Sequence, residues 1–346
     1  MNLKAIKEQT IVITGGSSGI GLTTAKMAAE RGAHVVLVAR DEDGLRRVRD
    51  EIRAHGGRAD YVTGDVGVRE DMRRAVASIL DRFGGFDTWV NDAGVGVYAK
   101  LEELSDEDHQ RLFQTNYFGV VYGSLEALKH LKKDGGALIN IGSIASELPT
   151  PVLSAYAASK HAVKGFTDSL RLELIAEGAP VSVTLIQPSG IHTPFGEHAL
   201  NYMDHASVVP PPVYAPEVVA DAILSAAERP QRDLVVGGVG RGMILFSRLL
   251  PNIADKVFAN AFSKTAVDPS RPPRESKGLH RPGAAGKMYG DQGGYMLKSS
   301  LYTQMKTRPI ATAATAAALG IGGALFSGWL LGPRAQGDQK SNPAMS

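Results

Sequence analysis

The sequence contains no cysteine among its 346 residues. This absence excludes disulfides, thiolate catalysis and cysteine zinc sites, and it is typical of a protein of the reducing cytoplasm. An excess of one charge is also missing, since 38 Lys and Arg residues face 36 Asp and Glu residues and leave a net charge of +2. We therefore expect no nucleic acid partner. The N-terminal residues lack the pattern of a leader, so we also expect no signal peptide.

What the sequence does have is a regular alternation of short β-branched runs with amphipathic stretches of helical length, such as 22–31 and 43–55. The runs predict seven strands, at residues 11–14, 35–39, 60–63, 88–91, 137–141, 181–187 and 234–236. Parallel strands need a crossover connection, which is usually a helix. The alternation therefore predicts an α/β fold with a doubly wound, Rossmann-like parallel sheet over residues 1–238.

The remaining residues change in character. Residues 239–266 carry apolar side chains at helical spacing and predict two short amphipathic helices that are separated at Pro251. Residues 267–309 are rich in proline, glycine and basic residues and predict a flexible linker. Residues 310–332 contain no charged residue and predict a hydrophobic helix, and residues 333–346 form a polar tail.

The uncharged stretch 310–332 is a candidate transmembrane anchor. At about 1.5 Å per residue, a helix over this stretch would reach roughly the 30 Å of a hydrocarbon core. Much of the stretch is alanine and glycine, so the hydrophobic signal is marginal. Three interpretations stay open: a membrane span that leaves the catalytic domain in the cytoplasm, a helix packed on protein or on an oligomer partner, and disorder.

A glycine-rich motif stands between the first predicted strand and the first predicted helix. It reads Thr14-Gly15-Gly16-Ser17-Ser18-Gly19-Ile20-Gly21, with the spacing G-x-x-x-G-x-G. Glycines at this junction permit a tight turn and let backbone N–H groups and the helix N-terminus approach a pyrophosphate. A structural turn can also contain such glycines, but their place between strand and helix predicts a nucleotide site. We expect cofactor contacts from Gly15, Ser17, Ser18, Gly19, Ile20 and Gly21.

The end of the second predicted strand bears on the choice of cofactor. An NAD site usually places an acidic residue there for the ribose 2′-hydroxyl, whereas a cation favours a 2′-phosphate. The sequence has Ala39 followed by Arg40, whose planar cationic fork suits phosphate. The alternative is a solvated arginine at the start of a helix. Arg40 therefore predicts NADP(H) as the preferred cofactor, and NAD(H) stays open because Asp41 is adjacent.

A tyrosine and a lysine stand four residues apart, at Tyr156 and Lys160, which places them on one face of a helix. A free tyrosine has a pKa of about 10, and a cation held beside it favours the phenolate. Ser143 follows the predicted strand 137–141, and ligands of an open parallel sheet bind at the carboxyl ends of its strands. These three side chains predict an acid–base site.

Together these motifs resemble those of the short-chain dehydrogenase/reductase family, over about residues 8–236. The resemblance implies a catalytic tetrad of Asn116, Ser143, Tyr156 and Lys160. In reduction, Tyr156 would donate the proton and Ser143 would bind the substrate oxygen. Lys160 would grip the nicotinamide ribose and lower the tyrosine pKa, and Asn116 would hold a water in the proton relay.

The resemblance also implies further cofactor contacts, from residues that follow the third, fourth and sixth predicted strands. They are Asp65, Val66, Asn91, Ala93, Gly94, Pro188, Gly190, Ile191 and Thr193. Two positions depart from the family pattern. Asp92 replaces the second asparagine of Asn-Asn-Ala-Gly, a change that we expect to spare catalysis, and Ser189 stands where glycine is usual.

The expected mouth of the site is apolar. It offers Val95, Val97, Tyr98, Ile144, Leu148, Leu153, Phe195 and Tyr202, although several of these could instead pack the core. The sequence thus predicts an NADP(H)-dependent oxidoreductase that interconverts a carbonyl and an alcohol on a small apolar substrate. The alternative is a nucleotide-binding scaffold or redox sensor without turnover. We also expect a homo-oligomer and, since His192, His198 and His205 lack acidic partners nearby, no metal.

Overall fold

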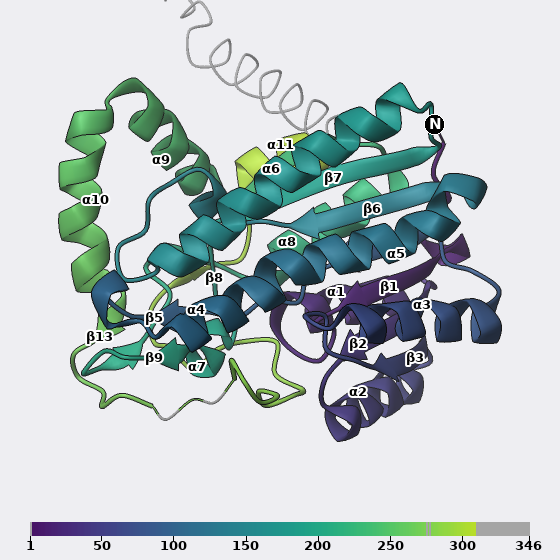
Figure 1. Cartoon of the computed structure of the whole chain (residues 1–346), viewed down its shortest axis with the longest axis horizontal. Helices are drawn as coiled ribbons and strands as arrows, with labels where there is room; N and C mark the ends of the chain where they lie inside the picture. Colours follow the sequence, from purple (N-terminus) through teal and green to yellow (C-terminus); the bar gives the residue numbers. More distant parts are fainter. Residues whose placement is uncertain (1, 275, 277, 309–346) are drawn as a thin grey trace, which may run out of the picture. The chain divides into compact units, whose positions relative to one another are not determined.

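The computed structural model describes residues 2–308, apart from 275 and 277. The chain divides into two compact units after Thr303, and the first unit holds the main sheet. Within the described residues this sheet has seven strands in the order β12-β7-β6-β4-β1-β2-β3, all of them parallel (Figure 1). The strands are β1 (Thr10–Thr14), β2 (His34–Ala39), β3 (Arg58–Thr63), β4 (Thr88–Asn91), β6 (Gly136–Ile141), β7 (Val181–Pro188) and β12 (Asp233–Val236). The predicted strands and the α/β class are confirmed.

Helices cover both faces of the sheet, which is why its strands are apolar throughout. One face packs against α1 (Gly19–Glu30), α2 (Glu42–Ala54) and α8 (Pro216–Glu228). The other face packs against α3 (Arg69–Phe83), α5 (Gly119–Asp134) and α6 (Ser154–Ala176) (Figure 1). Side chains of a strand alternate between the faces, so Ile11 and Ile13 lie in the first core and Val12 lies in the second.

Shorter elements precede β1 or lie in the connections between the main strands and helices. They are the helical turns η1 (Ile6–Glu8), η2 (Leu101–Glu103), η3 (Gln114–Phe118) and η4 (Ile144–Ser146), the helices α4 (Asp106–Phe113) and α7 (Phe195–His198), and the short strands β5 (Val97–Tyr98), β8 (Gly190–Ile191), β9 (Leu200–Asn201), β10 (Ala206–Ser207) and β11 (Val213–Tyr214). The α4 helix begins with a capped turn, in which the Ser105 hydroxyl accepts from the Asp108 backbone N–H at 3.2 Å.

After β12 the chain forms α9 (Gly238–Leu249) and α10 (Pro251–Thr265), a hairpin drawn in green in Figure 1. Two helices that meet at Pro251 thus occupy the segment for which amphipathic helices are expected. Proline suits the first turn of α10, because the N–H groups of a first turn have no acceptor within the helix and the missing N–H of proline costs nothing there. Phe246 and Phe258 pack against each other between the two helices, with ring centroids 6.1 Å apart.

The structure differs from the expected flexible linker at 267–309. The described residues of 267–303 include β13 (Val267–Asp268), which pairs with β10, and β14 (Met296–Leu297), which pairs with β11. Leu279 between these strands is completely buried. The sequence pattern missed this packing because most of the segment lies as irregular backbone, which has no hydrophobic period to detect.

The structure also bears on the membrane prediction, although only in part. Among the described residues, which include the last described helix, α11 (Leu301–Thr307), no helix is both long and apolar enough to cross a membrane. The predicted hydrophobic helix at 310–332 and the polar tail at 333–346 lie outside the described residues.

Candidate active site at the carboxyl ends of the strands

A cavity of about 310 Å³ opens where β1, β4, β6 and β7 end. Most of the predicted site residues line it, although they come from segments far apart in the sequence. They are Gly15, Ser17, Ser18, Gly19, Ile20, Arg40, Asp65, Val66, Ala93, Gly94, Ser143, Tyr156, Lys160, Pro188, Gly190, Ile191 and Thr193. The sheet topology brings them together, because the connections reverse direction on either side of β1 and leave a crevice there.

Three of the predicted residues, Gly21, Asn91 and Asn116, do not line this cavity. A Cβ at Gly21 would lie 2.5 Å from the Gly15 carbonyl oxygen, so this glycine lets α1 approach the loop closely. The Asn91 amide donates to the Ser124 hydroxyl at 3.0 Å and to Asn140 Oδ1 at 2.8 Å. Both residues support the cavity wall from behind, and the prediction that they contact the cofactor directly does not agree with their positions.

Tyr156 and Lys160 lie one turn apart on α6, as the spacing predicts. The Lys160 side chain is buried, and its ammonium donates to the Ile141 carbonyl at 2.8 Å and lies 5.8 Å from the centroid of the Tyr156 ring. Ser143 caps the η4 turn just after β6, where its hydroxyl accepts from the Ala145 N–H at 3.1 Å. The Ser143 side chain lies close enough to Tyr156 to lower the pKa of the tyrosine. The η4 turn after β6 and the first turns of α6 therefore form one polar cluster.

Burial dominates the electrostatics of this cluster. It raises the pKa of Tyr156 to about 12, against the hydrogen bond from Ser143, which lowers it. It also lowers the pKa of Lys160 to about 8, although the nearby Asp92 carboxylate opposes this change. The predicted lowering of the tyrosine pKa is therefore wrong for this structure, because the loss of solvation outweighs the favourable contacts of the phenolate.

Asp92, the departure from Asn-Asn-Ala-Gly, is the third titratable group of the cluster. Burial raises its pKa to about 7, and the Lys160 ammonium and the Gly21 backbone N–H counteract that rise. The backbone N–H groups of Asp92 and Ala93 both point at the Thr14 hydroxyl, at 3.1 and 3.2 Å. The ends of β1 and β4 are thus tied together next to the glycine motif.

Asn116 is fully buried in η3, a single turn of π-helix between α4 and α5. Its side-chain amide accepts from the Val95 N–H at 2.8 Å and donates to the Val95 carbonyl at 3.0 Å. The same amide donates to the Ser159 hydroxyl at 3.1 Å. Asn116 therefore fixes the loop after β4 against the catalytic helix α6, and π-helical turns often occur at functional sites.

The glycine motif forms a tight turn between β1 and α1. Gly15 adopts a φ of +73°, and a Cβ there would lie 2.8 Å from the Ala93 Cα. Gly19 has a φ of +53° and lies next to Thr193. A side chain at Gly15 would be strained and would collide with the β4 end, so the turn requires glycine. The result is a cradle of backbone at the N-terminus of α1, of the kind that binds phosphate.

Arg40 lies at the rim of this cradle and is held by the C-terminal part of the chain. Its guanidinium donates to the carbonyl oxygens of Gly278, Leu279 and Arg281, at 2.7, 3.1 and 2.9 Å. Burial lowers its pKa, and among the ion pairs of the described residues none involves Arg40. Asp65 is paired instead with the Arg111 guanidinium. The reading of Arg40 as a solvated helix-start arginine does not fit these contacts.

The segment after β7 forms the opposite wall. Ser189, which stands where glycine is usual, donates its hydroxyl to the Val236 carbonyl at 2.8 Å and so ties this segment to β12. Thr193 is buried and lies directly against Gly19. The serine is accommodated because its hydroxyl has a backbone partner, and it leaves Gly190 and Ile191 on the cavity surface.

The apolar end of the cavity agrees with most of the predicted mouth. Val95, Tyr98, Ile144, Leu148, Leu153 and Phe195 line it. Val97 is instead buried in a neighbouring core, and Tyr202 points away and donates to the Asp108 carboxylate. Sequence reasoning missed Phe262 on α10 and Gly278, Pro282 and Gly283 further along. Phe262 could have been found, because it is an aromatic residue on a predicted amphipathic helix. No sequence pattern marks Gly278, Pro282 or Gly283.

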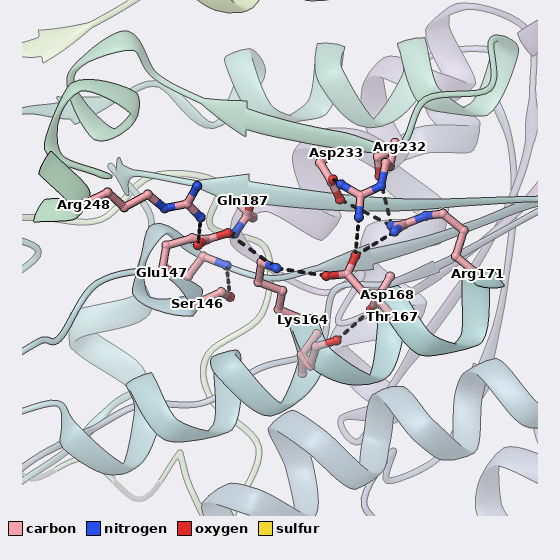
Figure 2. Close-up of polar contacts among 12 residues, drawn as sticks. Ser146, Glu147, Lys164, Thr167, Asp168, Arg171, Gln187, Arg232, Asp233 and Arg248 are labelled. Atoms are coloured by element: carbon pink, nitrogen blue, oxygen red, sulfur yellow. Dashed lines mark hydrogen bonds and ion pairs between the residues drawn. The ribbon is translucent and has the colours of Figure 1, made fainter. Parts of the chain in front are cut away.

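Glu147, at the end of the η4 turn, anchors this apolar end (Figure 2). Its carboxylate accepts from Arg248 of α9 at 2.6 Å and from the Gln187 amide of β7 at 3.3 Å, and Lys164 of α6 lies 3.8 Å away. Figure 2 shows that the same lysine leads on to Asp168, Arg171 and Asp233. A half-buried charge network thereby connects the Ser143 turn to the helical hairpin that carries Phe262.

A doubly wound sheet with a glycine cradle and a buried tyrosine–lysine pair defines a nicotinamide-dependent oxidoreductase. The family model for short chain dehydrogenases matches residues 9–202, more than half of the chain. The chain therefore belongs to the short-chain dehydrogenase family, and the family resemblance that its motifs indicated is confirmed.

Individual relatives agree with this assignment. The chain is 44% identical to "Uncharacterized oxidoreductase YxnA" of Bacillus subtilis, over 92% of this chain and 91% of that protein. It is 30% identical to 11-beta-hydroxysteroid dehydrogenase A of Sesamum indicum, over 81% of this chain and 83% of that protein. Among solved structures it resembles an alcohol dehydrogenase of Thermococcus sibiricus in complex with 5-hydroxy-NADP, with a TM-score of 0.58, 26% identity, and coverage of 66% of this chain and 95% of that one.

Proposed function

We propose that the protein interconverts a carbonyl and an alcohol on a small apolar substrate, with NADP(H) as the hydride carrier and Tyr156 as the general acid and base. The observation that carries the proposal is that Tyr156, Ser143 and Lys160 line one cavity, which has a glycine cradle at one end and apolar side chains at the other. A protein that only bound a nucleotide would need the cradle alone. The tyrosine–serine pair therefore favours turnover over the scaffold alternative.

Burial raises the pKa of Tyr156 to about 12, which suits its hydroxyl to the role of proton donor in reduction. At neutral pH the hydroxyl stays protonated, so it can donate to a carbonyl oxygen while Ser143 hydrogen-bonds the same oxygen. The buried Lys160 ammonium lies below the tyrosine ring and stabilises the phenolate that remains. The nicotinamide, when bound, supplies the hydride. Oxidation of an alcohol needs the phenolate from the start and so would be favoured at higher pH.

The residues of the cradle fit a dinucleotide. Gly15 leaves its backbone open where a Cβ would fill the turn, and Arg40 is a half-buried cation whose described partners are all neutral carbonyls. The Asp65 carboxylate acts on Arg40 but is itself paired with Arg111, so an anion such as a 2′-phosphate would give this partly buried guanidinium an ion-pair partner of its own. This argument supports NADP(H) over NAD(H). The substrate class rests on the apolar cavity lining and on relatives that are named hydroxysteroid dehydrogenases.

The direct test of the reaction is NADPH oxidation over a panel of apolar ketones and aldehydes, including steroid ketones. We expect the wild-type protein to turn over at least one of them, and Tyr156→Phe to lose at least about 100-fold in kcat because the proton donor is gone. NADPH binding by the variant, followed by fluorescence, should stay within about twofold of wild type, a change of under 0.5 kcal/mol. If both proteins bind NADPH and neither turns over a substrate, the scaffold alternative is favoured.

The cofactor preference is tested by Arg40→Asp. We expect the affinity for NADPH to fall about 100-fold, since a charged pair is lost and a repulsive carboxylate is added, while the affinity for NADH falls less than about tenfold. Arg47→Asp is the matched control, because Arg47 lies on the neighbouring helix with its side chain 68% exposed. Equal losses for NADPH and NADH would contradict the assignment of Arg40 to the 2′-phosphate.

Two finer expectations complete the proposal. Membrane association through 310–332 stays a prediction, since that stretch lies outside the described residues. The expected homo-oligomer also stays a prediction.

A further inference from the structure

Residues 278–292 cross the mouth of the cofactor cradle as irregular backbone, and we call this segment the strap. Each side of the strap is fixed by a short strand, β13 before it and β14 after it, which pair with β10 and β11 of the segment that follows β7. In Figure 1 the strap is the green loop that extends toward α2. The strap is thus held at both ends and passes over the glycine motif between them.

The strap makes its polar contacts with the groups that form the cradle. The Gly19 N–H donates to the Lys287 carbonyl at 2.8 Å, and the Gly286 N–H donates to the Ser17 carbonyl at 2.9 Å. Arg40 donates to three strap carbonyls, as described above. Gly278, Pro282 and Gly283 of the strap line the same cavity as the glycine motif. The strap is therefore a wall of this site rather than a neighbour of it.

Close backbone approaches fix the position of the strap. A Cβ at Gly278 would collide with the His198 carbonyl, and a Cβ at Gly290 would lie 2.6 Å from the Thr193 carbonyl oxygen. Leu279 is completely buried, and the His280 ring lies 2.6 Å from the Asp108 carboxylate. By contrast, a Cβ at Gly293, just after the strap, would meet nothing within 4 Å. Gly278, Gly283 and Gly290 of the strap thus serve close packing, whereas Gly286 within the strap and Gly293 after it do not.

We propose that the strap is a latch on the cofactor site, that it must lift for the nucleotide to enter or leave, and that Arg40 holds it shut. The proposal rests on the proposed function, in that the nucleotide is NADP(H). A guanidinium has five N–H donors, and the three bonds to the strap leave donors free for an anion. One side chain can therefore bind the strap and a 2′-phosphate together. NADPH bound there would fix Arg40 and keep the strap closed, so NADPH should leave more slowly than NADH.

The first experiment measures the rate at which NADPH leaves the full-length protein, by stopped-flow fluorescence with excess NADP⁺ as the competitor. Gly278→Ala pushes the strap away from His198 and should weaken its bonds to Arg40, so we expect release about tenfold faster than from wild type. Gly293→Ala is the matched control and should release NADPH at the wild-type rate. Gly290→Ala gives a second lifted strap should Gly278→Ala fold poorly. Wild-type release rates in both strap variants would overturn the proposal.

The second experiment needs no variant. Lys287 is exposed, with its side chain 55% accessible, and the bond to Met288 is a trypsin site in the middle of the strap. We expect saturating NADPH to slow cleavage after Lys287 at least about fivefold, NADH at equal occupancy to slow it less, and cleavage after Lys298 to stay unchanged. Cleavage after Lys287 is expected to slow because the nucleotide binds the closed strap and so reduces the population of the open strap that trypsin can cut. Faster cleavage with NADPH would mean that the nucleotide displaces the strap, and unchanged cleavage would mean that the strap does not respond; either result overturns the proposal.

The outcomes separate this proposal from the proposed function. A protein that binds NADPH with a responsive strap but reduces no substrate would contradict the reaction and keep the latch. A protein that reduces substrates with NADPH while both strap variants release it at the wild-type rate would contradict the latch and keep the reaction. A wild-type protein that binds neither NADPH nor NADH overturns both.

Discussion

Two regions form the walls of the same cavity and are held in place by different means. The catalytic side, with Ser143, Tyr156 and Lys160, stands on β6 and α6, whose backbone groups bond within the sheet and the helix. The strap side has irregular backbone, and its carbonyls are satisfied by Arg40 and by the Gly19 N–H of the cradle. The first region therefore keeps its shape by itself, whereas the second depends on the site that it covers.

We infer from this difference that the catalytic side is rigid and that the strap side can move. A proton donor must be held within hydrogen-bonding distance of its partner, and rigid secondary structure does this best. A cofactor must be exchanged, and a segment with few internal hydrogen bonds can open without unfolding the sheet. Three predictions test how far the comparison holds.

The largest expected effect lies on the catalytic side, where Lys160 and Lys164 occupy consecutive turns of α6. Lys160→Met should reduce kcat about 100-fold or more, since the phenolate of Tyr156 loses its cation. Lys164→Met should change kcat less than about twofold, because Lys164 pairs with Asp168 at 2.9 Å in the outer network and surface pairs contribute little. Steady-state kinetics on both variants checks this, and similar losses would mean that the network of Figure 2 takes part in catalysis.

The second prediction concerns the stability of the strap side. Leu279→Ala should lower the free energy of unfolding by about 2–3 kcal/mol, as expected for a leucine that is fully buried. Leu249→Ala on α9 is the control and should change it by less than about 0.5 kcal/mol, since that side chain is 68% exposed. Urea unfolding with matched m-values checks the pair. A loss at Leu279 no larger than at Leu249 would show that the strap is only loosely attached and would weaken the comparison.

The third prediction concerns the pH dependence of stability that Asp92 introduces between the two walls. Its pKa is raised to about 7 in the folded protein from 3.8, so wild-type stability should fall as the pH rises between these values. Asp92→Asn removes that fall. The variant should match wild type near pH 4 and become more stable than wild type as the pH rises toward 7. The raised pKa corresponds to a gain of at most about 4 kcal/mol, at about 1.4 kcal/mol per pKa unit. Thermal unfolding across pH checks this, and a gain already present at pH 4 would contradict it.

The sequence by itself determined the regular part of this protein. Each of the seven strands begins and ends close to its predicted bounds, since doubly covered strands must be apolar and their connections must be helices. The catalytic side could be predicted from the spacing of Tyr156 and Lys160 and from the place of Ser143 after a strand. Their geometry follows from helix and sheet periodicity. The glycine motif followed for the same reason, since a strand–turn–helix junction is local.

Only the tertiary structure decided the rest, and the common reason is that long-range contacts leave no period in the sequence. Residues 278–292 have the composition of a linker, yet Arg40 binds them across more than 230 positions of the chain. Val97 and Tyr202 were expected in the cavity, but each turns to a nearer partner, a second core and the Asp108 carboxylate. The pKa of Tyr156 likewise depends on how deeply the fold buries it, which the spacing to Lys160 does not reveal.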